Sequence, residues 1–265
     1  MAVFKYSNSG ATHMVAGTGN VQMVMIARTA KEFFTTFIER EAKANGFKAV
    51  VNGSYVDLSF VSKVAVKSND EPLDASDSQP VGRVIQNGKL LAGSSSTGKF
   101  YFSQNVCGID KFTSGPGDPP SSSCAAIGGV APIIVDGLPY GTTNTYSAAV
   151  PAGAPLTGDV DAKYRGNLLQ KSNAMFTQIL ARGPSVGKMA IGYSTSKQTV
   201  LILGQADGAS GLDAEGMRSI FIGTKVDNAV FLDCSDSATL WYDGKFLISP
   251  GQDKNEFLTV AVGFK

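Results

Sequence analysis

Two aspartates follow apolar runs in the second half of the chain, near the points where these runs end. The run at residues 199–203 is soon followed by Asp207, and the run at residues 228–232 leads directly into Asp233. A loop of small residues comes after each aspartate. Because loops positioned by a rigid scaffold often carry function, this layout favours a binding or catalytic site over a plain core. Asp207 and Asp233 are therefore the candidate catalytic carboxylates, with a turn or helix-cap role as the structural alternative for each.

The rest of the composition restricts the available chemistry. The chain has 265 residues and a single histidine, His13, so a Ser-His-Asp triad or a multi-histidine metal site would have to be built around that residue. Lys and Arg number 23 against 22 Asp and Glu, and the net charge of +1 offers no electrostatic case for a nucleic acid or an anionic membrane as partner. We therefore expect carboxylates, hydroxyls and backbone amides to act on a small molecule, without a cofactor.

The three cysteines, Cys107, Cys124 and Cys234, leave the redox compartment open. None lies in a CxxC pair, so a structural zinc site is not expected. Cys107 and Cys124 flank a loop-like stretch and could form a disulfide in an oxidising compartment, whereas three free thiols suit a reducing one. Residues 1–5 show no apolar core of a signal peptide, and no apolar run approaches the length of a membrane span. The expectation is a soluble protein, cytoplasmic unless an export signal has been removed.

Two segments have the spacing of helices. Thr29 and Glu32 form a capping-box pattern, and apolar residues then recur at helical spacing up to Asn45-Gly46, which supplies a stop. This pattern predicts a helix over residues 30–44. Similar spacing predicts a second helix over residues 212–223, and a short helix within residues 164–180 is a further expectation.

The remaining pattern consists of short strands separated by turns. Asn87-Gly88, Asp136-Gly137 and Asp243-Gly244 each predict a hairpin turn. Further strands are expected at residues 3–6, 21–26 and 60–66, and loops rich in small or polar residues at 10–20, 110–123 and 142–161. Because strands and helices do not alternate regularly, the predicted fold class is α+β: one domain over residues 1–265, with a large mixed or antiparallel sheet and a few packed helices.

Five segments, taken in order, resemble motifs of the phosphodiester glycosidase family. They lie within residues 47–265, after the strands and helix expected in residues 1–46. The family has Asn-Gly-Gly-Phe, a Gly-Gly-x-Pro-like segment, Arg-Thr-Ala-Ile-Gly, Asp-Gly and Leu-Asp-Gly-Gly-Gly-Ser-Ser-Thr. The corresponding segments here are Asn52-Gly53-Ser54-Tyr55, Gly128-Gly129-Val130-Ala131-Pro132, Lys188-Met189-Ala190-Ile191-Gly192, Asp207-Gly208 and Leu232-Asp233-Cys234-Ser235-Asp236-Ser237-Ala238-Thr239.

The chain departs from the family pattern at two places. Lys188 stands where the family has arginine, which keeps a positive charge but loses the bidentate fork of a guanidinium. Cys234-Ser235-Asp236 replaces the triple glycine, whose backbone amides can approach a phosphate or sugar oxygen. Asp236 also adds a negative charge that would repel a phosphodiester. Either the substrate differs from that of the family or hydrolysis has been lost.

The resemblance implies hydrolysis of a sugar 1-phosphodiester, or a related sugar-phosphate or nucleotide linkage, at the anomeric carbon. Asp207 and Asp233 would supply the carboxylates, and Lys188 would hold the phosphate. The other substrate-binding candidates are Asn52, Gly53, Gly128, Gly129, Asp236, Ser237 and Thr239.

Three alternatives remain open at this point. The same fold could bind a sugar phosphate or nucleotide without cleaving it. The chain could instead be an interaction protein of a phage or secretion system, with the loops at 110–123 and 142–161 as partner surfaces. Lastly, Asp207, Asp233 and Asp236 could hold a hard cation in a metal-dependent hydrolase, although nothing in their spacing requires one.

Overall fold

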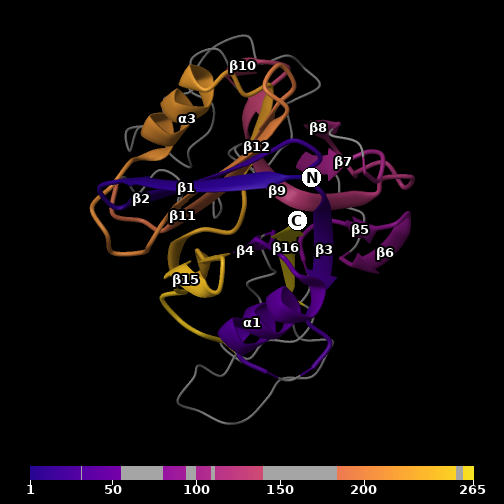
Figure 1. The fold of residues 1–265 in the computed structure, drawn as a ribbon, viewed down its shortest axis with the longest axis horizontal. Coiled ribbons are helices and arrows are strands. Elements are labelled where there is room, and N and C mark those ends of the chain that lie inside the picture. The colour runs from indigo at the N-terminus through magenta and orange to yellow at the C-terminus, as the bar shows by residue number, and fades with distance from the viewer. Residues whose placement is uncertain (31, 55–79, 94–99, 109–110, 140–183, 255–258) are drawn as a thin grey trace.

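The computed structural model describes residues 1–30, 32–54, 80–93, 100–108, 111–139, 184–254 and 259–265 (Figure 1). The strand expected at 60–66, the loop expected at 142–161 and the helix expected within 164–180 lie outside these ranges. The described part is rich in sheet, with two α-helices and two sheets.

The larger sheet has eleven strands, and its strand pairs are antiparallel. Its main path runs β1 (Val3–Ser9), β2 (Thr12–Thr18), β12 (Thr199–Gln205), β11 (Lys188–Ser194), β13 (Asn228–Phe231), β9 (Ala125–Val135), β5 (Val84–Gln86) and β6 (Lys89–Ala92). Off this path, β7 (Phe100–Gln104) pairs with β8 (Phe112–Pro116) and β9, and β10 (Leu138–Pro139) pairs with β9. The predicted large sheet is thus present and antiparallel.

A second sheet of five antiparallel strands was not anticipated from the sequence. Its order is β15 (Lys245–Ile248), β14 (Leu240–Tyr242), β4 (Ala49–Asn52), β16 (Val260–Phe264) and β3 (Met23–Ala27). The sheet joins strands from both ends of the chain, and this long-range pairing leaves no local signal in the sequence.

The helices and sheets stack in layers (Figure 1). Helix α1 (Phe34–Asn45) packs Phe37 and Ile38 on one face of the five-stranded sheet, against Val50 and Ala261. The opposite face of that sheet packs against the larger sheet, where Ile248 of β15 meets Gly204 of β12. Helix α3 (Ala214–Gly223) covers the far side of the larger sheet, since Phe221 lies over Gly192 of β11. The two helices therefore lie on opposite outer faces.

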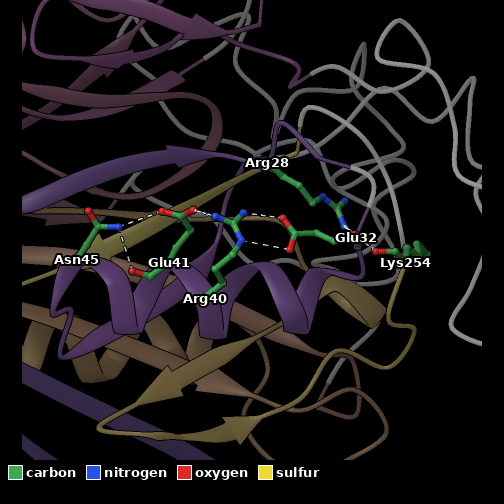
Figure 2. A network of polar contacts seen from close by, with 6 residues as sticks. All are labelled: Arg28, Glu32, Arg40, Glu41, Asn45 and Lys254. Carbon is green, nitrogen blue, oxygen red and sulfur yellow. Dashed lines mark hydrogen bonds and ion pairs between the residues drawn. The ribbon is translucent and has the colours of Figure 1, made fainter.

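The capping box predicted for α1 is wrong. The helix begins at Phe34 rather than at residue 30, and Phe33, its N-cap, makes no side-chain cap. Asp253 takes the capping role from a distant part of the chain, accepting hydrogen bonds from Thr35 N (3.1 Å) and Thr35 Oγ1 (2.5 Å). Glu32 turns instead to Arg40, with Oε1 2.6 Å from Nη2 (Figure 2). A long-range carboxylate thus replaces the local cap.

Other local predictions had mixed outcomes. The three hairpin turns are confirmed, because both residues of each Asn-Gly or Asp-Gly pair have the positive φ that such turns need. Residues 10–20 were expected to form a loop, but they contain β2, which is paired on both sides. Residues 110–123 likewise contain β8. In both cases pairing with neighbouring strands overrides a composition rich in small residues.

Cys107 and Cys124 form a disulfide, with their Cα atoms 5.1 Å apart, and Cys234 is a buried free thiol. Of the two states left open by the sequence, this is the one that suits an oxidising compartment. Within the described residues, no helix is both long and apolar enough to cross a membrane.

Candidate active site

A pocket opens at the N-terminal end of α1, on the α1 face of the five-stranded sheet. The space in and in front of the pocket, open solvent included, amounts to about 420 Å³. Its lining combines charged, amide and hydroxyl side chains with an apolar wall: Arg28, Asp233 and Lys254; Asn52, Gln252, Ser54, Ser237 and Thr259; Phe34, Gly53, Pro250 and Val260. Four of the residues selected from the sequence meet here: Asn52, Gly53, Asp233 and Ser237.

Asp233 is the only carboxylate among the described residues that line the pocket. It follows β13, and its backbone N–H donates to Gly53 O at 2.9 Å, which ties it to the end of β4. Its Oδ1 accepts from Cys234 N at 2.9 Å, so the carboxylate is held by its own loop. The side chain is half-buried. These contacts fix a carboxylate at the pocket wall while keeping it accessible.

Asn52 frames the loop that carries Asp233. The side chain is 2% exposed; its Nδ2 donates to Asp233 O at 2.9 Å, and its Oδ1 accepts from Thr239 N at 2.9 Å. The amide therefore bonds both ends of the turn at residues 233–239. Asn52 thus positions the Asp233 loop and also lines the pocket, so its expected contact with a substrate stays a prediction.

Arg28 was missed by the sequence analysis, although it directly follows an apolar strand just as Asp233 does. The residue is 1% exposed, and its Nη1 donates to Glu32 O at 2.7 Å and Lys254 O at 2.8 Å (Figure 2). Its guanidinium carbon lies 5.4 Å from the centre of the Phe34 ring, within the range of a cation–π contact. Arg28 thus links the end of β3, the start of α1 and the strand-like segment at Lys254 into one wall.

Asp236 does not line the pocket, and its negative charge is paired with Lys254. Its Oδ2 lies 3.1 Å from Lys254 Nζ, and Lys254 lines the pocket whereas Asp236 does not. The repulsion of a phosphodiester expected from Asp236 is therefore reduced by a neighbouring cation. Lys254 was also missed, because it lies in a polar stretch without a motif.

Ser235 keeps the backbone shape that a glycine would adopt. Its φ is 62°, in the left-handed region, and its N–H donates to Gly187 O at 2.8 Å. A side chain there costs about 1–2 kcal/mol, whereas glycine adopts this shape without that strain. The Cys234-Ser235-Asp236 segment therefore contains, at Ser235, a backbone conformation that favours glycine.

Replacing Ser235 with glycine is expected to raise the free energy of unfolding by about 0.5–1 kcal/mol, after the greater flexibility of glycine in the unfolded chain is subtracted. Urea unfolding measures the change. Ser235→Ala is the matched control, because alanine keeps the Cβ that causes the strain. A gain in both variants, or in neither, would contradict the assignment.

Asp207 lies behind the loop rather than in the pocket. Its Oδ1 accepts from Gly187 N at 2.7 Å, and Gly187 O accepts from Ser235 N. The side chain is exposed, and it is not among the described residues that line the pocket. The structure thus connects Asp207 to the Asp233 loop through one residue, but it does not bring the two carboxylates into one pocket.

Lys188 lies on the other side of the larger sheet from the pocket. Alternate strand residues face opposite sides, so Lys188 shares its face with Gly192, over which α3 packs. The side chain is fully buried, and its Nζ donates to Val186 O at 2.8 Å. Burial lowers the pKa of Lys188 from its ordinary value of 10.5. This placement does not suit a phosphate partner in the pocket.

The lowered pKa of Lys188 predicts a pH-dependent contribution to stability. The unfolded chain, in which Lys188 has its ordinary pKa of 10.5, binds the lysine proton more tightly than the folded chain does. The free energy of unfolding therefore rises with pH between the lowered pKa of the folded chain and 10.5. Relative to Lys188→Met, the wild type should gain up to about 1.4 kcal/mol per pH unit within that window. Urea unfolding of both proteins at several alkaline pH values checks this, and a difference independent of pH would contradict it.

Three other candidates have structural roles in the described region. Gly128 and Gly129 lie in β9 and pack closely on Gly82, where a side chain at either position would meet backbone atoms. Thr239 is buried, and its hydroxyl donates to Ser237 O at 2.9 Å. None of the three lines the pocket. His13 lies on β2, with its Nδ1 2.8 Å from the Tyr6 hydroxyl.

Within the described ranges, no group of three or more His, Cys, Asp or Glu side chains is arranged to hold a metal ion. Asp233 and Asp236 belong to one loop, but Asp207 lies behind it. The three-aspartate cation site considered from the sequence is therefore not gathered in one place.

Comparison with solved structures reveals a shared fold. The catalytic domain of zebrafish N-acetylglucosamine-1-phosphodiester alpha-N-acetylglucosaminidase, auto-inhibited by its pro-peptide, superposes with a TM-score of 0.56 at 14% identity, covering 99% of this chain and 81% of that one. A protein from Burkholderia pseudomallei gives a TM-score of 0.53 at 10% identity, covering 95% and 73%. No protein-family model matches the sequence, and no curated protein matches it. At these identities the likeness concerns the fold alone.

Proposed function

We propose that the protein is a glycosidase-type hydrolase that cleaves a sugar 1-phosphodiester at the anomeric carbon. The observation that carries the proposal is the placement of Asp233 in a pocket whose other charged lining residues, among those described, are Arg28 and Lys254. A carboxylate beside two cations suits a substrate that contains both a reactive acetal carbon and an anion. The fold shared with the zebrafish phosphodiester glycosidase supports the same assignment.

The proposed reaction needs one carboxylate. Asp233 accepts a proton from a water molecule whose oxygen bonds to the anomeric carbon. The bond between that carbon and the phosphate oxygen breaks, and its electron pair leaves with the phosphate as a phosphomonoester. Because a phosphate ester is already a good leaving group, the general acid of an ordinary glycosidase is less necessary. Lys254 offsets the charge of the leaving phosphate.

The binding-module alternative rests on the altered loop at residues 234–236. Two observations weigh against it: Ser235 retains the left-handed backbone of a glycine, and Asp236 is paired with Lys254. The loop therefore differs from the family pattern without filling the pocket.

Incubation with a panel of sugar 1-phosphodiesters in ¹⁸O-labelled water tests the proposal. N-acetylglucosamine 1-phosphodiesters head the panel because the zebrafish neighbour is named for that linkage. We expect free sugar and phosphomonoester as products, with the label in the sugar. Label in the phosphate would show P–O cleavage and a different class of hydrolase. Tight binding without turnover would identify a binding module.

A further inference from the structure

Three strand ends of the five-stranded sheet bring a row of polar side chains to the pocket. In the β4–β16 pair Asn52 lies opposite Ala261, and the same register continued by two residues sets Ser54 opposite Thr259. On the other side of β16, Arg28 N donates to Thr259 O at 2.8 Å, which continues the β3–β16 register. Ser54, Thr259 and Arg28 therefore lie side by side, and all three line the pocket. We call them the polar row.

The polar row lies one step beyond the part of the sheet that α1 covers. The preceding row on the same face, Asn52, Ala261 and Ile26, is closed by packing and hydrogen bonds. Helix α1 begins only at Phe34, whose side chain borders the pocket. Because the helix does not extend past Phe34, it does not cover the next row, which borders the pocket.

The two hydroxyls of the polar row are buried without a partner among the described residues. Ser54 is 4% exposed and Thr259 is 6% exposed, and neither hydroxyl makes a hydrogen bond there. Buried polar groups are nearly always hydrogen-bonded, because burial without a partner costs free energy. Two such groups next to each other in a pocket indicate a ligand that satisfies both.

The two hydroxyls of the polar row match the hydrogen-bonding chemistry of a sugar. A hydroxyl both donates and accepts, as do the hydroxyls of a sugar, whereas a phosphodiester oxygen only accepts. Phe34 and Pro250 provide apolar surface for the C–H groups of a sugar ring. Moreover, the row is more deeply buried than Lys254, whose side chain is 15% exposed. A phosphodiester is flanked by organic groups on both sides, so the terminal sugar is the part that can reach such a buried position.

We infer that the polar row of Ser54, Thr259 and Arg28 is the subsite for the terminal sugar, with Lys254 on the phosphate side. The choice of a sugar rests on the proposed function. Ser54 and Thr259 exchange hydrogen bonds with sugar hydroxyls, and Arg28 donates to an oxygen of the same ring or its substituent. Ser54 and Thr259 thus determine which sugar is bound, and they take no part in breaking the bond between the anomeric carbon and the phosphate oxygen.

Binding of free monosaccharides, including N-acetylglucosamine, tests the inference without requiring turnover. Calorimetry or ligand-observed NMR compares wild type with Ser54→Ala and Thr259→Val. Each variant should weaken the binding of the preferred monosaccharide by about 5- to 10-fold, the effect of one neutral hydrogen bond. Thr259→Ser keeps a hydroxyl and should retain most of the affinity. Neither Ser54→Ala nor Thr259→Val should lower Tm, because each removes a buried group that has no partner in the free protein.

Several results would overturn the inference: no binding of any monosaccharide to the wild type, unchanged affinity in the double variant, or a loss of Tm in both single variants. Inorganic phosphate is the second probe. If the two variants weaken phosphate binding instead, the row is a phosphate subsite and the sugar assignment is wrong. If the protein hydrolyses a sugar 1-phosphodiester but the two variants bind the sugar as the wild type does, only the assignment of the polar row is wrong. If the variants weaken sugar binding but the wild type shows no turnover, only the proposed hydrolase activity is wrong.

Discussion

Replacing Asp233 with asparagine is expected to lower kcat for a sugar 1-phosphodiester by about 10²–10⁴-fold, the usual loss when a general base is removed. Asparagine has the shape of aspartate, and its side-chain oxygen can still accept from Cys234 N, so the loop should keep its path. It cannot take a proton from water. KM should change little, because the variant removes a group needed in the transition state rather than in binding. Steady-state kinetics with release of the sugar as readout measures both parameters.

Asp207→Asn is the matched control for this prediction. Both aspartates follow strands, and each accepts a hydrogen bond from a backbone amide, but the Asp207 side chain does not line the described pocket. We expect its kcat to stay within about threefold of wild type, since asparagine retains the bond to Gly187 N. A large loss in Asp207→Asn with a small loss in Asp233→Asn would reverse the assignment of the catalytic carboxylate.

Replacing Asn52 with alanine is expected to lower the free energy of unfolding by about 2–4 kcal/mol, because it removes the side-chain hydrogen bonds to one buried and one partly buried backbone group. These groups are the carbonyl of Asp233 and the N–H of Thr239, both 2.9 Å from the Asn52 amide. The loop that carries Asp233 loses its frame at the same time, so kcat should fall as well. Urea unfolding and steady-state kinetics on the same preparation measure the two effects.

Asn45→Ala serves as the comparison for Asn52→Ala. Asn45 is exposed at the end of α1, where its Nδ2 donates to Glu41 O at 3.0 Å (Figure 2). Its loss should change stability by no more than about 0.5 kcal/mol, as is usual for surface sites. Equal effects of the two substitutions would show that the Asn52 amide does not hold the loop.

Much of the local structure could be predicted from the sequence. The three Asn-Gly and Asp-Gly turns formed as hairpins because their chemistry is local. The apolar runs before Asp207 and Asp233 are β12 and β13, within a residue or two. The end of α1 before Gly46, which adopts a left-handed conformation, also follows from neighbouring residues.

Long-range pairing is the part that local patterns could not supply. The five-stranded sheet joins β3 and β16 from opposite ends of the chain, and the polar row exists only because those strands are neighbours. Local sequence also does not show which face of the sheet a strand residue lies on. Lys188 matches the motif position of a phosphate ligand, yet its side chain lies on the α3 side of the larger sheet. Arg28 and Lys254 carry no motif, so only their position in the fold shows that they line the pocket.

A crystal structure of the Asp233→Asn variant with a bound sugar 1-phosphodiester tests the central claim most directly. We expect the anomeric carbon to lie within reach of a water held by the side chain at position 233, with reacting atoms about 3–3.5 Å apart. The sugar should contact Ser54, Thr259 and Arg28, with the phosphate near Lys254. A substrate bound next to Asp207 or Lys188, or one with its phosphate on the polar row, would contradict it.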